Sequence, residues 1–546
     1  MSLRTMASVC GLVATAWVTT ADAQDACTKL LSLALPATTI TDARTVPTGD
    51  VKIRLPVPGE GTVRLPAHCR VTGSIKPTAD SDIRFEVWLP ASGWNHRYQQ
   101  VGNGGLAGII PEFSMVGPLL GGYATASTDD GHENTRDFDA GWAAGHPEKL
   151  IDYGYRAVHL TALAGEALVQ AYFSQAARNT YFTGCSDGGR ESLMEAQRYP
   201  KDFDGYLVGA PGIDIPNNEV GHLHVSQALH SLGPGGRLTV SQLEALSAKV
   251  LERCDALDGL KDGQLRDPRQ CPFKAAEAVC SSGQSCLTPA QATAIQAIYD
   301  GARDGATGRQ LTPGDFGTLG TEAATWPGIF VDTAAGPAVG SIAGESVIGT
   351  LLYHEAKPDI ASIDVAKAAR DAKSRLAPIM NSDNPDLRTA RGTGRKILQY
   401  HGWADPNVRP QYSIEYFQAV QRFLKTDTKD FYRLFMVPGM AHCTGGVGPT
   451  NLSGFAPNPV PHDPEHDWIS ALEHWVEDGV APERMIATEF KLDRPLAPYA
   501  AAPAGTPVKR TRPLCPYPMV AVYQGTGDVD NAASFRCERV EPSSLN

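Results

Sequence analysis

The sequence lacks the features that mark several large classes of protein. It contains no block of like charges, no internal repeat and no low-complexity tract in its 546 residues, and its formal net charge is −12. A chain with this charge is a poor partner for nucleic acid or for an anionic membrane surface, so we expect neither. Apolar residues make up 42% of the chain, which excludes global disorder and allows a substantial core.

The apolar segment at the N-terminus is too short to cross a bilayer. It extends from Ala7 to Thr19 after the basic Arg4, and Ala21-Asp22-Ala23 follows it. This A-x-A pattern is typical of a secretory signal peptide that is cleaved before Gln24, whereas a buried N-terminal helix would not need it. We therefore expect residues 1–23 to be a signal peptide and the mature protein to be secreted or periplasmic.

Cysteine is present in quantity, but never with the C-x-x-C spacing of many metal sites. Of the 11 cysteines, Cys10 lies in the expected signal peptide, and the remaining even number predicts disulfides in an exported chain. Proximity in the sequence suggests four pairs and leaves two distant cysteines for a fifth, although sequence alone does not fix the connectivity. The suggested pairs are Cys27–Cys69, Cys254–Cys271, Cys280–Cys286, Cys515–Cys537 and Cys185–Cys443.

The most informative stretch is Thr183–Gly189, which has the pattern G-x-S-x-G around Ser186. A β-prone run precedes it and a helix-like run follows it, which is the context of a nucleophile elbow. An ordinary glycine-rich turn would not require a serine at its apex. The start of the helix leaves backbone N–H groups unpaired, and that of Asp187 is the candidate to hold an oxyanion. In the glycine-rich stretch 102–108, Gly104 or Gly105 is the candidate second donor, although a plain turn is the alternative.

Apolar patterns alternate between strand and helix along much of the chain, which predicts a mostly parallel sheet covered on both faces. Strand-like runs fade between about residues 217 and 391, where helical segments mix with loops. We interpret that segment as an inserted lid. The expected architecture is thus an α/β-hydrolase fold with a large lid domain: core residues 24–216, lid 217–391 and core 392–546.

Two further residues complete a catalytic triad in the chain order of α/β hydrolases. Asp405 follows the strand-like run 396–400, and His442 follows the run 431–437. His132 and His401 are alternative bases, but both precede Asp405, and His401 is better interpreted as a support or a wall of the pocket. A bond between Cys185 and Cys443 would join the immediate neighbours of Ser186 and His442.

An acidic loop lies within the expected lid. Asp255, Asp258 and Asp262 are interleaved with glycines, which suits a hard cation such as Ca²⁺ and equally suits a solvated Asp-Gly turn. The spacing differs from that of an EF-hand, and it leaves both interpretations open.

The stretches 184–189, 401–405 and 438–443 together resemble the tannase/feruloyl esterase family, whose members share a Cys-Ser, Asp and His-Cys constellation. The resemblance implies that Ser186, Asp405 and His442 form the triad. It also implies a structural Ca²⁺ in the acidic loop, held by the side chains of Asp255, Asp258 and Asp262 and by the backbone oxygens of Leu260 and Gln264.

The expected function is a secreted serine esterase that cleaves small aromatic acid esters, feruloyl or other hydroxycinnamoyl esters first. Galloyl esters and mono(2-hydroxyethyl) terephthalate are alternative substrates, and a non-catalytic binding protein on a hydrolase fold is the alternative from another class. We expect Val408 to flank the acyl pocket. Arg391 or Arg395 could bind a substrate carboxylate, although surface arginines are the simpler interpretation.

Overall fold

The computed structural model describes residues 20–54, 60–134, 138–281, 283, 285–355, 359–453, 459–492 and 502–540. The expected signal peptide lies outside these residues as far as residue 19, and helix α1 (Thr20–Lys29) spans the expected cleavage point. Within the described ranges, no helix combines the length and the apolar character that crossing a membrane would require.

A nine-stranded sheet forms the centre of the protein, in the order β1-β4-β5-β7-β6-β8-β9-β10-β11. The first three pairings are antiparallel, and the five from β7 to β11 are parallel. Parallel neighbours need long crossover connections, which the helices between them supply. The strands are β1 Thr38–Val46, β4 His68–Ile75, β5 Ile83–Pro90, β6 Arg97–Val101, β7 Ala124–Thr128, β8 Asn179–Cys185, β9 Gly205–Gly209, β10 Lys396–Gly402 and β11 Tyr432–Val437.

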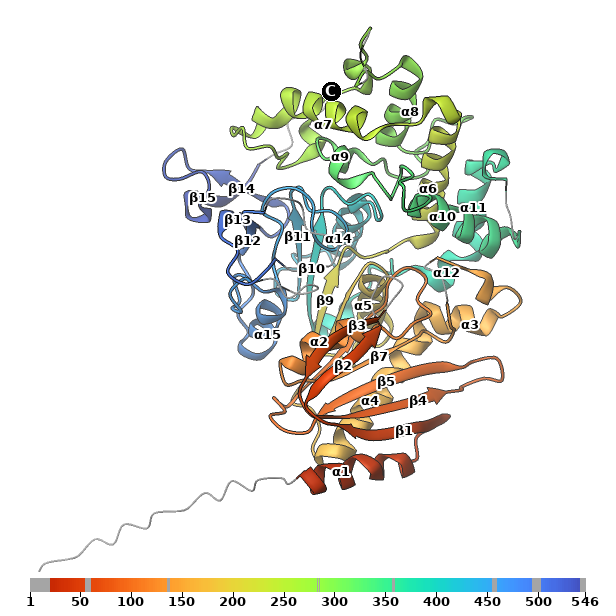
Figure 1. Ribbon diagram of the computed structural model, residues 1–546, viewed down its shortest axis with the longest axis vertical. Coiled ribbons are helices and arrows are strands. Elements are labelled where there is room, and N and C mark those ends of the chain that lie inside the picture. The colour runs from red at the N-terminus through yellow and green to blue at the C-terminus, as the bar shows by residue number, and fades with distance from the viewer. Residues whose placement is uncertain are drawn as a thin grey trace, which may run out of the picture.

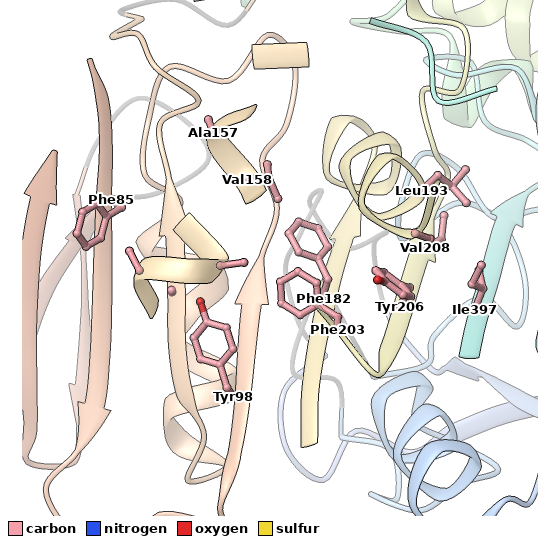
Figure 2. Packing of buried hydrophobic residues seen from close by; sticks show 14 of the residues in the cluster. Phe85, Tyr98, Ala157, Val158, Phe182, Leu193, Phe203, Tyr206, Val208 and Ile397 are labelled. Carbon is pink, nitrogen blue, oxygen red and sulfur yellow. The ribbon is translucent and has the colours of Figure 1, made fainter. Parts of the chain in front are cut away.

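Helices cover both faces of this sheet. One face packs against α4 (Ala157–Phe173), α5 (Asp187–Arg198) and α14 (Pro410–Leu424), and Figure 2 shows Tyr98, Phe182 and Tyr206 within that layer. The other face packs against α2 (Glu112–Leu120) and α15 (Trp468–Asp478). Side chains therefore alternate between the two layers along each central strand, as in β8, where Tyr181 and Phe182 belong to different clusters.

The described residues between β9 and β10 contain helices, loops and isolated bridges but none of the named strands. Figure 1 shows α7, α8 and α9 above β9, β10 and β11, with α6, α10 and α11 beside them at the upper right. Most of the buried apolar side chains of these helices belong to two clusters, one of which also includes Leu106, Ala107 and Tyr153 from the segment before β8. The division into core and lid domains stays a prediction. The helices are α6 Ile215–His230, α7 Val240–Cys254, α8 Pro289–Asp300, α9 Glu322–Thr325, α10 Val339–Gly344, α11 Val365–Arg375, α12 Ala377–Met380 and α13 Arg388–Gly392.

The second part of the expected core also contains two small antiparallel sheets that the sequence patterns did not indicate. One pairs β12 (Met485–Phe490) with β13 (Val508–Leu514), and the other pairs β14 (Met519–Tyr523) with β15 (Phe535–Arg539). A third such pair, β2 (Gly49–Arg54) with β3 (Glu60–Leu65), lies in the N-terminal part of the chain.

Five disulfides join the ten cysteines after Cys10, in the four pairs that proximity suggested and in the distant pair that remained. Cys27–Cys69 ties α1 to β4, next to the edge strand of the sheet. Cys185–Cys443 links segments 258 residues apart and is the bond that bears on the candidate site.

Candidate active site

Ser186 lies at a strained turn between β8 and α5. Its φ of 64° and ψ of −120° are in a region that non-glycine residues seldom adopt. A Cβ on Gly184 would lie 2.2 Å from the carbonyl oxygen of Gly188, and one on Gly189 would lie 2.3 Å from that of Gly209. These backbone atoms cannot move aside, so the close crossing of strand and helix requires glycine there.

Asp405 and His442 reach the same edge of the sheet as Ser186. Ser186, Asp405 and His442 follow β8, β10 and β11, which run parallel, so their carboxyl ends meet at one edge. His442 Nδ1 lies 2.7 Å from Asp405 Oδ2, and the His442 side chain is 11% exposed while that of Asp405 is fully buried. A buried carboxylate in this position fixes the tautomer and the orientation of the imidazole.

The surroundings of Asp405 favour its charged form. Its Oδ1 accepts hydrogen bonds from the backbone N–H groups of Asn407 at 2.8 Å and Val408 at 3.0 Å. Burial alone would raise the pKa of Asp405, but the charge of His442 and the hydrogen bonds from His401 and His442 lower it below its ordinary value. Asp405 is therefore an anion at any pH at which the protein would work.

The neighbours of Ser186 and His442 are covalently joined. The Cys185–Cys443 bond has an S–S distance of 2.11 Å and holds the two Cα atoms 5.9 Å apart. Within the residues that the structure describes, no hydrogen bond joins Ser186 Oγ to His442. Such catalytic hydrogen bonds are often long in free enzymes and shorten when substrate binds. The structure thus brings the acid to the base, and brings the base near the serine.

Two sets of backbone N–H groups close to the elbow have no acceptor within the described chain. Asp187 is the first residue of α5, and its N–H makes no hydrogen bond within the described chain. The same holds for the N–H groups of Gly104 and Gly105, and a Cβ on Gly104 would find no atom within 4 Å. The loop is locked to the elbow because Gly188 N–H donates to Asn103 O at 2.8 Å. The arrangement can hold an oxyanion between α5 and this loop.

The two alternative bases are both buried, and each has a ring nitrogen engaged by another group. His401 is fully buried, and its ring nitrogens lie 2.7 Å from Ser413 Oγ and 2.9 Å from Val408 O. It supports the Asp405 loop and does not form a pocket wall. His132 is 3% exposed, its Nε2 lies 2.8 Å from Leu106 O, and burial lowers its pKa to about 4.

The segment between β9 and β10 contacts the Asp405 loop directly. Arg409, four residues after Asp405, is 1% exposed and pairs with the equally buried Asp315 at 2.9 Å. Asn218 of α6 donates to Asn407 O at 2.8 Å. Val408 is 7% exposed and adjoins Asp405 through its N–H, so its expected contact with the acyl group stays a prediction.

The expectation that Arg391 or Arg395 binds a substrate carboxylate is wrong. Arg395 precedes β10 and forms an ion pair with Asp204, which precedes β9. Arg391 pairs with Asp430 at 2.9 Å, just before β11. Both arginines therefore lie at the amino ends of the strands, about 20 Å from the carboxyl ends for a strand of this length. They are surface ion pairs, the simpler of the two interpretations.

The acidic loop has the donor chemistry for Ca²⁺ but is not arranged around one point. Asp255 Oδ1 accepts the N–H groups of Asp262 at 3.2 Å and Gly263 at 3.0 Å, and Asp262 pairs with Arg512 at 2.6 Å. Burial, with the nearby charges of Asp262 and Asp255, raises the pKa of Asp258. Three carboxylates and two backbone oxygens fit a hard cation, but Asp262 would have to leave Arg512 to join the others.

Sequence reasoning missed the groups that hold the backbone of the site. Glu191 accepts the Asn103 N–H at 3.0 Å, and the N–H groups of Asn407 and Val408 hold Asp405. The Asn103–Glu191 contact joins segments far apart in the sequence, and the Asn407 and Val408 donors are backbone groups outside the recognised motifs, so no residue pattern indicated these contacts.

Comparisons with known proteins agree with this geometry. Residues 69–538 match the family described as tannase and feruloyl esterase. An uncharacterized esterase of Xanthomonas campestris is 38% identical over 98% of this chain and 94% of its own length. A probable feruloyl esterase of Arthroderma benhamiae is 32% identical over 86% of each chain. The crystal structure of feruloyl esterase B from Aspergillus oryzae is 26% identical, covers 94% of this chain and 100% of its own, and superposes with a TM-score of 0.84.

The match extends over nearly all of the described sheet and over the helices between β9 and β10. The fold is accordingly that of the α/β hydrolases, as the alternation of strands and helices indicated. With both the sequence match and the superposition spanning most of the chain, the protein belongs to the tannase and feruloyl esterase family and is a carboxylic ester hydrolase.

Proposed function

We propose that the protein is a serine esterase that releases an aromatic acid from a small phenolic ester. The observation that carries the proposal is the Asp405–His442 hydrogen bond, tied to the Ser186 elbow by the Cys185–Cys443 disulfide. His442 Nε2 takes the proton of Ser186 Oγ as that oxygen attacks the ester carbonyl. Asp405 stabilises the imidazolium that forms.

The negative charge that develops on the carbonyl oxygen is held by backbone N–H groups. Asp187 supplies one, and Gly104 or Gly105 supplies the other. Collapse of the tetrahedral intermediate expels the alcohol, which takes the proton from His442. Water then attacks the acyl-enzyme with His442 again as base, and the free acid leaves with Ser186 restored.

Feruloyl or another hydroxycinnamoyl ester is the first candidate substrate. Its support is the relative named as a probable feruloyl esterase at 32% identity and the superposition on feruloyl esterase B. Galloyl esters and mono(2-hydroxyethyl) terephthalate are the alternatives within the same chemistry. A non-catalytic binding role would not require an aligned acid and base beside a strained serine.

Two further parts of the proposal concern stability and location. The loop Asp255–Gln264 binds a structural Ca²⁺ through Asp255, Asp258, Asp262, Leu260 and Gln264, after Asp262 turns away from Arg512. The protein is exported, and its five disulfides are consistent with an oxidising compartment.

The test is the Ser186→Ala variant. It removes the attacking oxygen, so hydrolysis of methyl ferulate, methyl gallate and mono(2-hydroxyethyl) terephthalate should fall by about 10³-fold or more. Thermal unfolding should change little, because Ser186 Oγ makes no hydrogen bond within the described chain. The ratio of kcat/KM among the three substrates assigns the acyl group.

Labelling by a fluorophosphonate supplies the second measurement. Wild-type protein should be labelled once and Ser186→Ala not at all. Ser374→Ala, on the exposed side of α11, is the matched control and should be labelled like the wild type. Ester hydrolysis by Ser186→Ala at the wild-type rate would remove Ser186 from the mechanism.

A further inference from the structure

Three buried carboxyl groups lie directly behind the nucleophile elbow. Asp130, Asp187 and Glu191 are 0%, 2% and 2% exposed, and one oxygen of each lies within 4.8 Å of the others. Asp130 follows β7 with a φ of 60°, and the other two belong to α5. Three charges of one sign this close and this dry could not all persist, so the cluster must contain compensating positive charge or protons.

The guanidinium of Arg190 lies in the cluster, but among the three carboxyl groups it binds Asp187 alone within the described chain. Arg190 donates through Nε to Asp187, through Nη1 to Gly154 O at 2.7 Å and through Nη2 to Tyr153 O at 3.0 Å. Asp187 Oδ1 also accepts the Tyr153 hydroxyl at 2.9 Å. Asp187 and Arg190 thus satisfy each other, and Asp130 and Glu191 receive nothing from Arg190.

Asp130 and Glu191 remain as a pair of acceptors facing each other. No donor within the described chain reaches either oxygen of Asp130 or Oε1 of Glu191, although the two side chains are within hydrogen-bonding distance. A proton between them satisfies Glu191 Oε1 and one oxygen of Asp130. Burial raises the pKa of both groups, and the mutual charge adds to the effect on Asp130.

Glu191 has a second contact, with the glycine-rich stretch 102–108 that carries the candidate oxyanion donors Gly104 and Gly105. Its Oε2 accepts the Asn103 N–H at 3.0 Å, while Asn103 O accepts the Gly188 N–H at 2.8 Å. Asn103 immediately precedes Gly104 and Gly105, and its carbonyl belongs to the same planar peptide unit as the Gly104 N–H. Holding Asn103 at both backbone atoms therefore fixes the position of the two candidate oxyanion donors.

We propose that Glu191 is a positioning residue for the oxyanion hole and that it is held in place by a proton shared with Asp130. The proposal rests on the proposed ester hydrolysis at Ser186. Glu191 touches no substrate. It acts through the Asn103 amide, and Asp130 supplies the hydrogen bond that keeps the buried Glu191 carboxyl oriented.

The other titratable groups around the pair leave this bond intact. Asp187 and Arg190 are paired on α5, Tyr153 is bound to Asp187, and the neutral His132 is bound to Leu106 O. Asp129, beside Asp130, accepts the N–H groups of Arg84 and Gly131, each at 2.9 Å.

The experiment compares amide and apolar replacements at both positions. In Glu191→Gln the amide oxygen can still accept from Asn103 while its NH₂ donates to Asp130, and in Asp130→Asn the amide donates to Glu191. Both variants should keep kcat within about threefold of wild type. Glu191→Met leaves the Asn103 N–H unpaired, and kcat should fall by about 10-fold to 100-fold with KM nearly unchanged.

Affinity for a transition-state analogue separates positioning from loss of fold. A boronic acid that forms a tetrahedral adduct with Ser186 should bind Glu191→Met more weakly by a factor similar to the loss in kcat, while the product acid binds as before. Equal kcat in Glu191→Met and wild type would overturn the proposal, and so would failure of Glu191→Gln to restore activity in a folded protein.

Glu195 offers a matched control one helical turn later. It is fully buried with both carboxyl oxygens lacking a donor, and it pairs with Asp202 rather than with the loop. Glu195→Met should alter thermal unfolding and leave kcat and boronic acid affinity unchanged. Loss of kcat in Glu195→Met equal to that in Glu191→Met would show a general effect of the helix and contradict the proposal.

An infrared measurement covers the case in which Glu191→Met does not fold. At pH 8 the wild type should show a protonated-carboxyl absorption that Asp130→Asn lacks, and an unchanged absorption would overturn the shared proton.

The shared proton would also be overturned if the wild type contains one bound metal ion per chain and Glu191→Gln does not, because a cation would then hold the carboxylates together. The proposed function is contradicted if the wild type hydrolyses none of the three esters, or if Ser186→Ala hydrolyses them like the wild type. If those two results are as expected and only the Glu191 variants deviate, the inference about Glu191 alone is contradicted.

Discussion

At the scale of single residues, the candidate site depends on keeping one carboxylate ionised where water is excluded. Asp405 is fully buried, a position that by itself favours the neutral acid. Two backbone N–H groups, His401 and His442 all contact it and reverse that preference. The imidazole of His442 consequently has one orientation, and its Nε2 is left free to serve as the base.

Asp405→Asn should abolish most activity while preserving the fold. The amide would present its NH₂ to His442 Nδ1 and select the tautomer whose Nε2 carries the proton, which cannot accept from Ser186. We expect kcat to fall by about 10³-fold to 10⁴-fold, measured with the best of the three ester substrates. Asp204→Asn, at the amino end of β9, is the control and should keep wild-type kcat. A kcat for Asp405→Asn within tenfold of wild type would argue against Asp405 as the triad acid.

At the scale of structural elements, the loops after β8 and β11 are held at a fixed separation by a covalent bond. Packing alone would allow the loop that bears His442 to shift by fractions of an ångström. A misplacement of about 1 Å can cost about 10²-fold in rate. The Cys185–Cys443 bond lies directly beside Ser186 and His442, the proposed nucleophile and base, where such a shift would matter most.

Removing this disulfide should therefore affect activity more than the fold. In the double variant Cys185→Ser and Cys443→Ser we expect kcat to fall by about 10²-fold. Loss of the cross-link should also lower stability, by up to about 5 kcal/mol in the chain-entropy description. Thermal unfolding and steady-state kinetics measure the two effects. Cys280→Ser with Cys286→Ser, which opens a loop of only 6 residues, should leave kcat unchanged; an equal loss in both variants would refute the positioning role.

The acidic loop gives a second prediction at this scale. If Ca²⁺ binds there, it should stabilise the folded state by about 2.7 kcal/mol at 100 times its Kd. EDTA should lower the Tm, and added Ca²⁺ should restore it. Asp258→Asn should no longer respond to EDTA, whereas Asp267→Asn should respond like wild type, because Asp267 pairs with Arg269 and is not a proposed ligand. A Tm that EDTA and Ca²⁺ both leave unchanged would refute the site.

At the scale of the whole molecule, several buried carboxyl groups have a raised pKa and so favour their neutral form. Burial is the main cause in each case, and it raises the pKa of Asp129, Glu166 and Glu473 to about 7 and that of Asp214 to about 6. In the unfolded chain such groups titrate near pH 4. Between about pH 4 and pH 7 the folded protein therefore binds more protons than the unfolded one.

Stability should consequently fall as the pH rises through this window. A raised carboxyl pKa contributes stability that is fully present below the unfolded value and is lost as the pH rises through the folded value. We expect a higher Tm at pH 5.5 than at pH 8 in thermal unfolding. Asp129→Asn should make the decline shallower by up to about 1.4 kcal/mol per pH unit. A Tm that rises from pH 5.5 to pH 8, or an unchanged slope in Asp129→Asn, would contradict this expectation.

The parts of this structure that sequence could predict are those with a local signature. The elbow around Ser186 needs glycines at fixed spacing, and the strands before Asp405 and His442 are mostly apolar runs, so both could be identified from the residues. The Asn103–Glu191 contact and the Asp315–Arg409 ion pair could not, because they join distant segments and leave no pattern in either. The prediction for Arg391 and Arg395 was wrong for a related reason. The sequence does not show whether an arginine beside a strand lies at the end of the sheet that carries the site or at the opposite end.

The Cys27–Cys69 bond has a practical consequence for handling the protein. It joins α1 covalently to β4. Figure 1 shows α1 beside β1 and β4, at the far side of the sheet from β10 and β11. A tag or linker placed just ahead of residue 27 would thus leave the molecule on the side opposite the catalytic loops. Enzyme immobilised on a resin through that end would present its working face to the solution.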